Sequence, residues 1–109
     1  MSRNDEHRVA DIFDAADELA VIVAMGPSDD DDGRIRLRAV ERLLEIIGEA
    51  TGALSDEFIG EYPGVPWSDI SALRILLAHH YHRIDPNQVW AIARVSVPDL
   101  VIALRSKGS

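Results

Sequence analysis

The sequence predicts an all-α protein, an antiparallel up-and-down bundle of four main helices followed by short C-terminal helices. Apolar residues recur at three- and four-residue steps through most of the 109 residues. No stretch alternates apolar and polar residues for long enough to indicate a strand. Glycine and proline separate the apolar runs by short connections, which favour antiparallel neighbours. We expect one domain over residues 1–109, because this length suffices for one core and not for two.

The first helix is expected over about residues 5–25. Asn4 or Asp5 can cap it, and Gly26-Pro27 ends it. The following loop holds four aspartates in a row, Asp29 to Asp32. Adjacent carboxylates without fixed geometry make a poor metal cage. We therefore expect these acids to be solvated and to favour the N-terminus of the next helix.

The second helix is expected over about residues 34–51. Gly48 lies inside its apolar pattern, although glycine costs about 1 kcal/mol against alanine in a helix. A glycine kept at such a position indicates close packing against another element. Ser55, three residues before an apolar aromatic residue, is expected to open a short third helix.

The fourth helix is expected to be continuous from a cap at Ser68 to about Arg83. Asp85-Pro86 marks the start of another helix, with aspartate at the cap and proline in the first turn. Val97-Pro98 is expected to break the chain before a last helix.

Composition limits the possible functions. The formal net charge of −8 argues against nonspecific nucleic-acid binding over the whole surface, but permits a local basic site. The absence of cysteine excludes disulfides, thiolate metal sites and cysteine catalysis. The N-terminus is polar, and the longest apolar run, Leu19 to Met25, is far too short to span a membrane. We expect a cytoplasmic protein that does not associate with membranes.

One segment carries a local excess of basic residues. No acid occurs between Asp69 and Asp85, and this interval contains Arg74, His79, His80, His82 and Arg83. Such a patch in an acidic protein indicates an anionic partner. Favourable positive charge at a helix C-terminus would also explain His80, His82 and Arg83. It would not explain Arg74, which lies two turns earlier. His79 and His82 could share a helix face, yet no third ligand is evident nearby, so we expect no metal.

Four sequence blocks together resemble the HepT-like proteins of the HEPN superfamily. The resemblance covers about residues 34–104, with a compatible first helix. The blocks are R-L-L-E-I-I-G-E-A at residues 42–50, Pro66-Trp67, R-I-L-L-A-H-H-Y at residues 74–81, and Ile84-Asp85 followed by Val89-Trp90 and Val97-Pro98-x-Leu100. Arginine followed five residues later by histidine is a weak signal alone, but the flanking blocks in the same order make it specific.

The resemblance implies a HEPN-like bundle that acts as a metal-independent endoribonuclease and needs no cofactor. It also implies that the protein is the toxin of a toxin–antitoxin module. Arg74 would stabilise the phosphorane, and His79 would transfer protons. Further candidates for RNA contact are His80, His82 and Arg83. Dependence on the 2′-hydroxyl would make DNA a non-substrate. Two copies are expected to form a homodimer whose cleft, built partly on the fourth helix, combines both sets of residues.

The resemblance also implies regulation through Tyr81. A cognate MntA-type nucleotidyltransferase antitoxin would transfer AMP from ATP to its hydroxyl, placing phosphate near Arg74. One departure is Ile75, where the family often has asparagine, because isoleucine cannot orient the histidine one turn later. His80 stands where glycine is common. A second hypothesis therefore remains open, a non-catalytic module that binds and regulates the nucleotidyltransferase.

Overall fold

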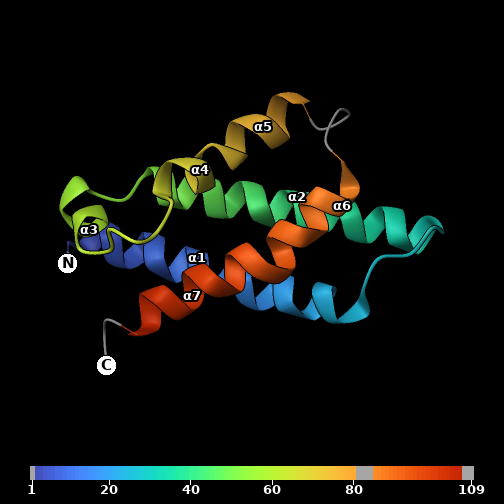
Figure 1. Cartoon of the computed structure of the whole chain (residues 1–109), viewed down its shortest axis with the longest axis horizontal. Coiled ribbons are helices and arrows are strands. Elements are labelled where there is room, and N and C mark those ends of the chain that lie inside the picture. Colours follow the sequence, from blue (N-terminus) through green and yellow to red (C-terminus); the bar gives the residue numbers. More distant parts are fainter. Residues whose placement is uncertain (1, 81–84, 107–109) are drawn as a thin grey trace.

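The protein is described by a computed structural model over residues 2–80 and 85–106, without the side chains of residues 79 and 80. Every regular element in these ranges is helical, which confirms the all-α prediction (Figure 1). The elements are α1 (Arg3–Met25), α2 (Asp31–Gly52), α3 (Asp56–Gly60), α4 (Trp67–Ser71), α5 (Leu73–His80), α6 (Pro86–Ala91), the π-helical segment η2 (Ile92–Ser96) and α7 (Val97–Ser106).

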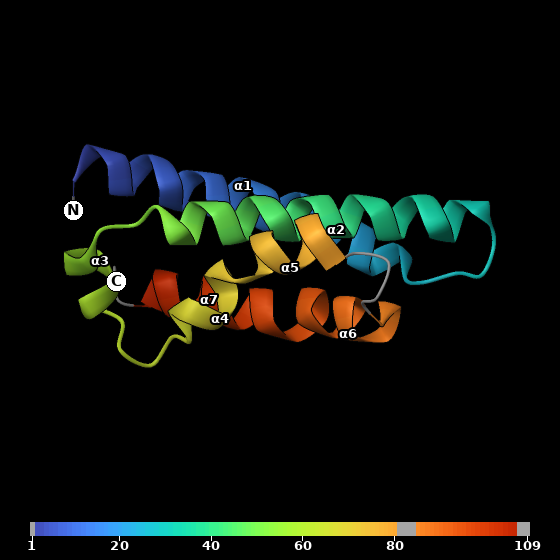
Figure 2. The ribbon, with the colours of Figure 1, turned by 90° about the horizontal axis from the view of Figure 1, so that it is seen from above.

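The helices form an elongated bundle with extents of 43 × 28 × 22 Å. α1 and α2 are a long antiparallel pair, and α4–α5 returns alongside α2 in the direction of α1. The continuous run α6–η2–α7 then reverses direction and packs against α1. Viewed from above, α5 lies between α2 on one side and α6 on the other (Figure 2). None of the helices in the described ranges is long and apolar enough to span a membrane.

The core is centred on the α1–α2 pair. The most deeply buried apolar side chains are Ile12, Leu19, Val40, Leu44 and Ile47, each at most 1% exposed. Removing one such side chain from water stabilises the fold by about 1.5–3 kcal/mol. The later helices cover this pair with a second set of buried residues, namely Trp67, Ile70, Leu77, Val89, Trp90, Ala93, Val97, Leu100 and Leu104.

The start of α1 corrects the predicted cap. Ser2 caps the helix, and its hydroxyl accepts a hydrogen bond from the Asp5 amide at 3.1 Å. Asp5 is instead buried, and its carboxylate accepts from the Ser55 amide at 2.8 Å and the Ser55 hydroxyl at 2.7 Å. These bonds, led by that from the Ser55 amide, lower the pKa of Asp5. The Asn4 side chain donates to the Ala53 carbonyl at 3.1 Å. Both predicted caps therefore tie α1 to the segment that joins α2 and α3.

α2 begins three residues earlier than predicted. Asp30 is the cap and accepts from the Gly33 amide at 2.9 Å, which is the main cause of its lowered pKa. Asp31 and Asp32 lie in the first turn, where negative charge complements the helix dipole. The predicted role of these acids at a helix N-terminus is thus confirmed. Across the described parts of the chain, no group of three or more histidine or acidic residues is arranged to hold a metal ion.

Gly48 lies at a close approach between helices, as its position in the pattern predicts. A methyl group at this position would lie 2.9 Å from the Arg74 amide nitrogen and 3.0 Å from the Ile70 carbonyl oxygen. Real side chains do not approach backbone atoms so closely. Glycine therefore allows the α4–α5 backbone to lie directly on α2.

The predicted single fourth helix is wrong, because the structure divides it at Ala72. α4 begins at Trp67, with Pro66 rather than Ser68 at the cap, and Ser68 lies inside the helix. The Trp67 indole donates to the Tyr62 carbonyl at 3.0 Å, which fixes the entry into α4. At the junction, the Ala72 carbonyl accepts from the amides of both Ile75 and Leu76, a tighter turn than an α-helix makes.

The C-terminal region confirms one predicted boundary and contradicts another. Asp85 caps α6 by accepting from the Asn87 amide at 2.9 Å, with Pro86 in the first turn. The chain does not break at Val97-Pro98, because η2 leads directly into α7. Proline removes one backbone donor and crowds the preceding turn, and the wider π turn ahead of Pro98 accommodates both effects.

Candidate functional site

α5 supplies the backbone of the candidate site. Arg74 and position 79 lie on this one helix, five residues apart. That spacing separates them by about 140° around the axis and about 7.5 Å along it. His79 and His80 are the last two residues of α5, and their side chains lie outside the described set. Tyr81, His82 and Arg83 also lie outside the described residues. The structure therefore defines the arginine side of the site.

α5 is held on the bundle mainly by α2. Leu77 is buried at 6% exposure, and Leu73 is half-buried against the core. The Arg74 main chain rests against α2 at Gly48. This contact places the first turn of α5 directly on α2. The Arg74 side chain itself is exposed to solvent.

Arg74 has no carboxylate within ion-pair distance among the described residues. Helical spacing places Glu41 and Glu45 on the same face of α2 as Gly48. Arg38 pairs with Glu41 at 3.0 Å, and Arg42 pairs with Glu45 at 3.4 Å. The charges of these four residues on α2 therefore cancel in pairs.

Apolar side chains occupy the rest of the outer surface of α5. Ile75 is 53% exposed and Leu76 is 36% exposed. Ile75 lies one helical turn before position 79, so the apolar surface adjoins the predicted catalytic histidine. The sequence analysis singled out Ile75 but not Leu76, because Leu76 lies only about 60° from the inward-facing Leu73 on a helical wheel and its spacing gives no sign of exposure.

The described part of the site can bind an anion. A guanidinium offers several N–H donors in a planar fork that matches two phosphate oxygens. Arg74 is exposed and has no acidic partner in the described part of the chain, so it can form such bonds without first breaking an ion pair there. Proton transfer would need a titratable group nearby, and histidine occupies positions 79 and 80 on the same helix.

Comparison with known proteins identifies a matching family and several relatives of part of the chain. The family model described as "Ribonuclease HepT-like" matches residues 12–106. "Putative RNase MJ0127" of Methanocaldococcus jannaschii is 45% identical over 62 residues, which are 57% of this chain and 51% of that protein. "Putative RNase MJ1380" of the same organism is 42% identical over 62 residues, or 57% of each chain.

"Probable ribonuclease HepT" of Thermococcus cleftensis is 36% identical over 62 residues, which are 57% of this chain and 56% of that protein. The chain thus spans about half the length of the curated relatives it matches. No solved structure matches the chain.

Proposed function

Because this chain belongs to the HepT-like ribonuclease family, we propose that it is a metal-independent endoribonuclease, the toxin of a toxin–antitoxin module. The observation that carries this proposal is the exposed Arg74 guanidinium. It lies on the helix that also bears His79, with no acidic partner in the described ranges. The ribonuclease names of the relatives support the class of substrate.

The proposed mechanism uses the 2′-hydroxyl of RNA as the nucleophile. His79 removes its proton, the oxygen attacks the adjacent phosphorus, and a protonated imidazole returns a proton to the departing 5′-oxygen. The products are a 2′,3′-cyclic phosphate and a free 5′-hydroxyl. Arg74 stabilises the additional negative charge of the phosphorane. His80, His82 and Arg83 are proposed to contact the RNA backbone.

A homodimer would complete this site. Arg74 and His79 diverge by about 140° on one helix, so a single copy does not direct both at one phosphate. Two copies related by a two-fold axis would bring two arginines and two histidines to one cleft. The exposed apolar surface formed by Ile75 and Leu76 supports burial of this face of α5 against a second copy.

Site-directed variants test the assignment on purified protein in the presence of a chelator. Arg74→Ala is expected to lower the rate of RNA cleavage by about 10²–10³-fold, as removal of a charge-stabilising donor does in other enzymes. His79→Ala is expected to abolish cleavage. Arg94→Ala removes an exposed arginine on η2 and is the matched control, expected to cleave at the parental rate. Parental cleavage by the Arg74 or His79 variant would refute the assignment.

Regulation is proposed to occur at Tyr81. A nucleotidyltransferase antitoxin holding Mg-ATP would join the phenol oxygen to the α-phosphorus and release pyrophosphate. The attached AMP would place negative charge near Arg74 and compete with RNA for the guanidinium. Tyr81 follows Arg74 by seven residues, which is nearly two turns of an ideal helix. Tyr81→Phe keeps the ring and removes the nucleophile. Incubated with the antitoxin and Mg-ATP, it should gain no mass and remain toxic. A gain in multiples of AMP would contradict this site.

Exposed Ile75 also favours a second candidate function, a non-catalytic module that binds and regulates the nucleotidyltransferase. An asparagine there could hold the histidine one turn later, whereas isoleucine offers only apolar contact. Expression of the chain alone separates the two functions. Growth arrest that requires His79 supports the ribonuclease, and normal growth with no RNA cleavage supports the binding module.

A further inference from the structure

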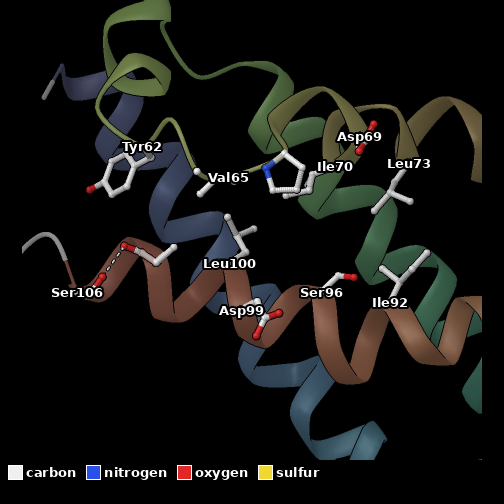
Figure 3. A pocket seen from close by; sticks show the side chains of 13 residues that line it. Tyr62, Val65, Asp69, Ile70, Leu73, Ile92, Ser96, Asp99, Leu100 and Ser106 are labelled. Atoms are coloured by element: carbon white, nitrogen blue, oxygen red, sulfur yellow. Dashed lines mark hydrogen bonds between the residues drawn. The ribbon is translucent and has the colours of Figure 1, made fainter.

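A groove of about 650 Å³ runs between α4–α5 and the η2–α7 helix (Figure 3). One wall carries Ile70 and Leu73, and the other carries Ile92 and Leu100. The lining residues of the second wall recur every three or four positions from 92 to 106. At 1.5 Å per residue this stripe is about 20 Å long, or nearly four helical turns.

Carboxylates flank this apolar interior. Asp69 projects from the α4 wall and Asp99 from the α7 wall (Figure 3), and both are exposed. No lysine, arginine or histidine lines the groove in the described ranges, and neither aspartate has an ion pair there. Acids often occupy the first turn of a helix, but η2 continues directly into α7, so Asp99 faces no free helix N-terminus.

The groove does not include Arg74. It opens between α4–α5 and η2–α7 and is lined on the α4–α5 side by Asp69, Ile70 and Leu73. Two carboxylates without a cation disfavour phosphate, so this surface is unsuited to RNA. Exposed carboxylates favour a partner that carries positive charge. Both the length and the charge of the groove fit a basic helix.

We propose that this groove binds an amphipathic helix of another protein, with apolar residues on one face and lysine or arginine on both sides of that face. Apolar side chains at i, i+3 or i+4, and i+7 would fill the interior along its length. The basic side chains would pair with Asp69 and Asp99 on the two rims. A compact apolar ligand would fill only part of a 20 Å groove. This inference does not depend on the proposed ribonuclease activity.

Three synthetic peptides of about four helical turns test the proposal by calorimetry on the full chain. The first has leucines on one face and lysines beside them, the second replaces the lysines with glutamates, and the third adds a central proline. We expect the first to bind at least about tenfold more tightly than the other two. No binding of the first peptide at about 1 mM would overturn the proposal. Equal binding of the glutamate peptide would show that the aspartates do not select for positive charge. Equal binding of the proline peptide would show that the bound segment need not be helical.

Charge reversal tests the location. Asp69→Lys with Asp99→Lys is expected to weaken binding of the lysine peptide by about tenfold or more. The matched control, Asp11→Lys with Asp14→Lys on α1, makes the same change in net charge at exposed acids outside the groove and should change affinity less than about twofold. Equal weakening by both pairs would overturn the location.

Steric blocking provides a second variant. Ser96 is exposed and lines the groove, so Ser96→Trp should fill it without removing a core residue. We expect loss of peptide binding and an unchanged RNA cleavage rate. If Ser96→Trp instead converts a self-associating parent into a monomer, the groove belongs to a second copy and the proposal fails. Should this variant fail to fold, the charge-reversal pair decides the result.

Discussion

The α1–α2 pair and the α4–α5 segment perform different tasks in the bundle. α1 and α2 are uninterrupted helices of 23 and 22 residues that supply the most deeply buried side chains. α4 and α5 have 5 and 8 residues, are separated at Ala72, and both pack against α2. Most of the described side chains of α5 are nevertheless exposed. The long pair provides stability, and the short segment presents Arg74.

Truncation of the long pair should have the largest effect on stability. Leu44→Ala removes a side chain that is 0% exposed, and we expect a loss of about 3 kcal/mol in the free energy of unfolding. Leu76→Ala on α5 is the control, because Leu76 is 36% exposed and should cost less than about 1 kcal/mol. Urea denaturation measures both values. Similar losses for the two variants would contradict the division of tasks.

Gly48→Ala should have the next largest effect, since it forces the two regions apart. The new methyl group would lie 2.9 Å from the Arg74 amide nitrogen, so the α5 backbone must shift. We expect a loss of about 2 kcal/mol and reduced RNA cleavage. Gly60→Ala is the control, because nothing lies within 4 Å of that position and alanine favours a helix by up to about 1 kcal/mol. An unchanged Gly48 variant would show that α5 does not rest on this contact.

Asp5→Asn should lower stability in a manner that depends on pH. The hydrogen bonds from Ser55 lower the pKa of Asp5, so the ionised form stabilises the folded state above the ordinary pKa of an aspartate. This contribution is lost as the pH falls through the lowered pKa. The difference in urea midpoint between parent and variant should be constant from about pH 5 to 7 and shrink below about pH 4. Asp11→Asn, at an exposed acid of α1, should show no such trend.

Ile75→Asn should have the smallest effect on stability and a positive effect on activity. The side chain is 53% exposed, so the free energy of unfolding should change by less than about 0.5 kcal/mol. An amide one turn before position 79 can hold the histidine ring, and we expect faster RNA cleavage. Val95→Asn, at a 58% exposed position on η2, controls for loss of surface hydrophobicity. Slower cleavage by Ile75→Asn would indicate that Ile75 contributes through apolar contact.

Much of the long pair could be predicted from its periodicity. Gly26 ends α1 with a positive φ, which glycine adopts readily. Gly48 lies where a side chain would meet the backbone of the neighbouring helix. Few other residues suit either position, so both glycines are informative in the sequence. The caps were harder to predict. Ser2, Asn4 and Asp5 are all suitable capping residues, and only tertiary contact with the segment after α2 determines which one caps.

The errors fall where long-range packing overrides a local signal. The break at Ala72 has no glycine or proline to announce it and follows from the anchoring of Trp67 and the contact at Gly48. Pro98 is a strong local breaker, yet the π turn of η2 keeps the chain helical. For the candidate site, the structure places Arg74 and Ile75 at exposed positions of α5, and their roles in the site stay predictions. The groove beside them joins segments distant in sequence, so periodicity alone could not predict it.

Subunit complementation tests the shared Arg74–His79 site most directly. Arg74→Ala and His79→Ala chains, each inactive alone, are co-expressed with different tags and assayed for RNA cleavage after purification through one tag and through both. If the arginine of one copy acts with the histidine of the other, the mixed dimer keeps one intact pair. A randomly assorted preparation should then recover roughly a quarter of parental activity, and the doubly purified mixed dimer roughly half. No recovery in a stable mixed dimer would contradict a site shared between two copies.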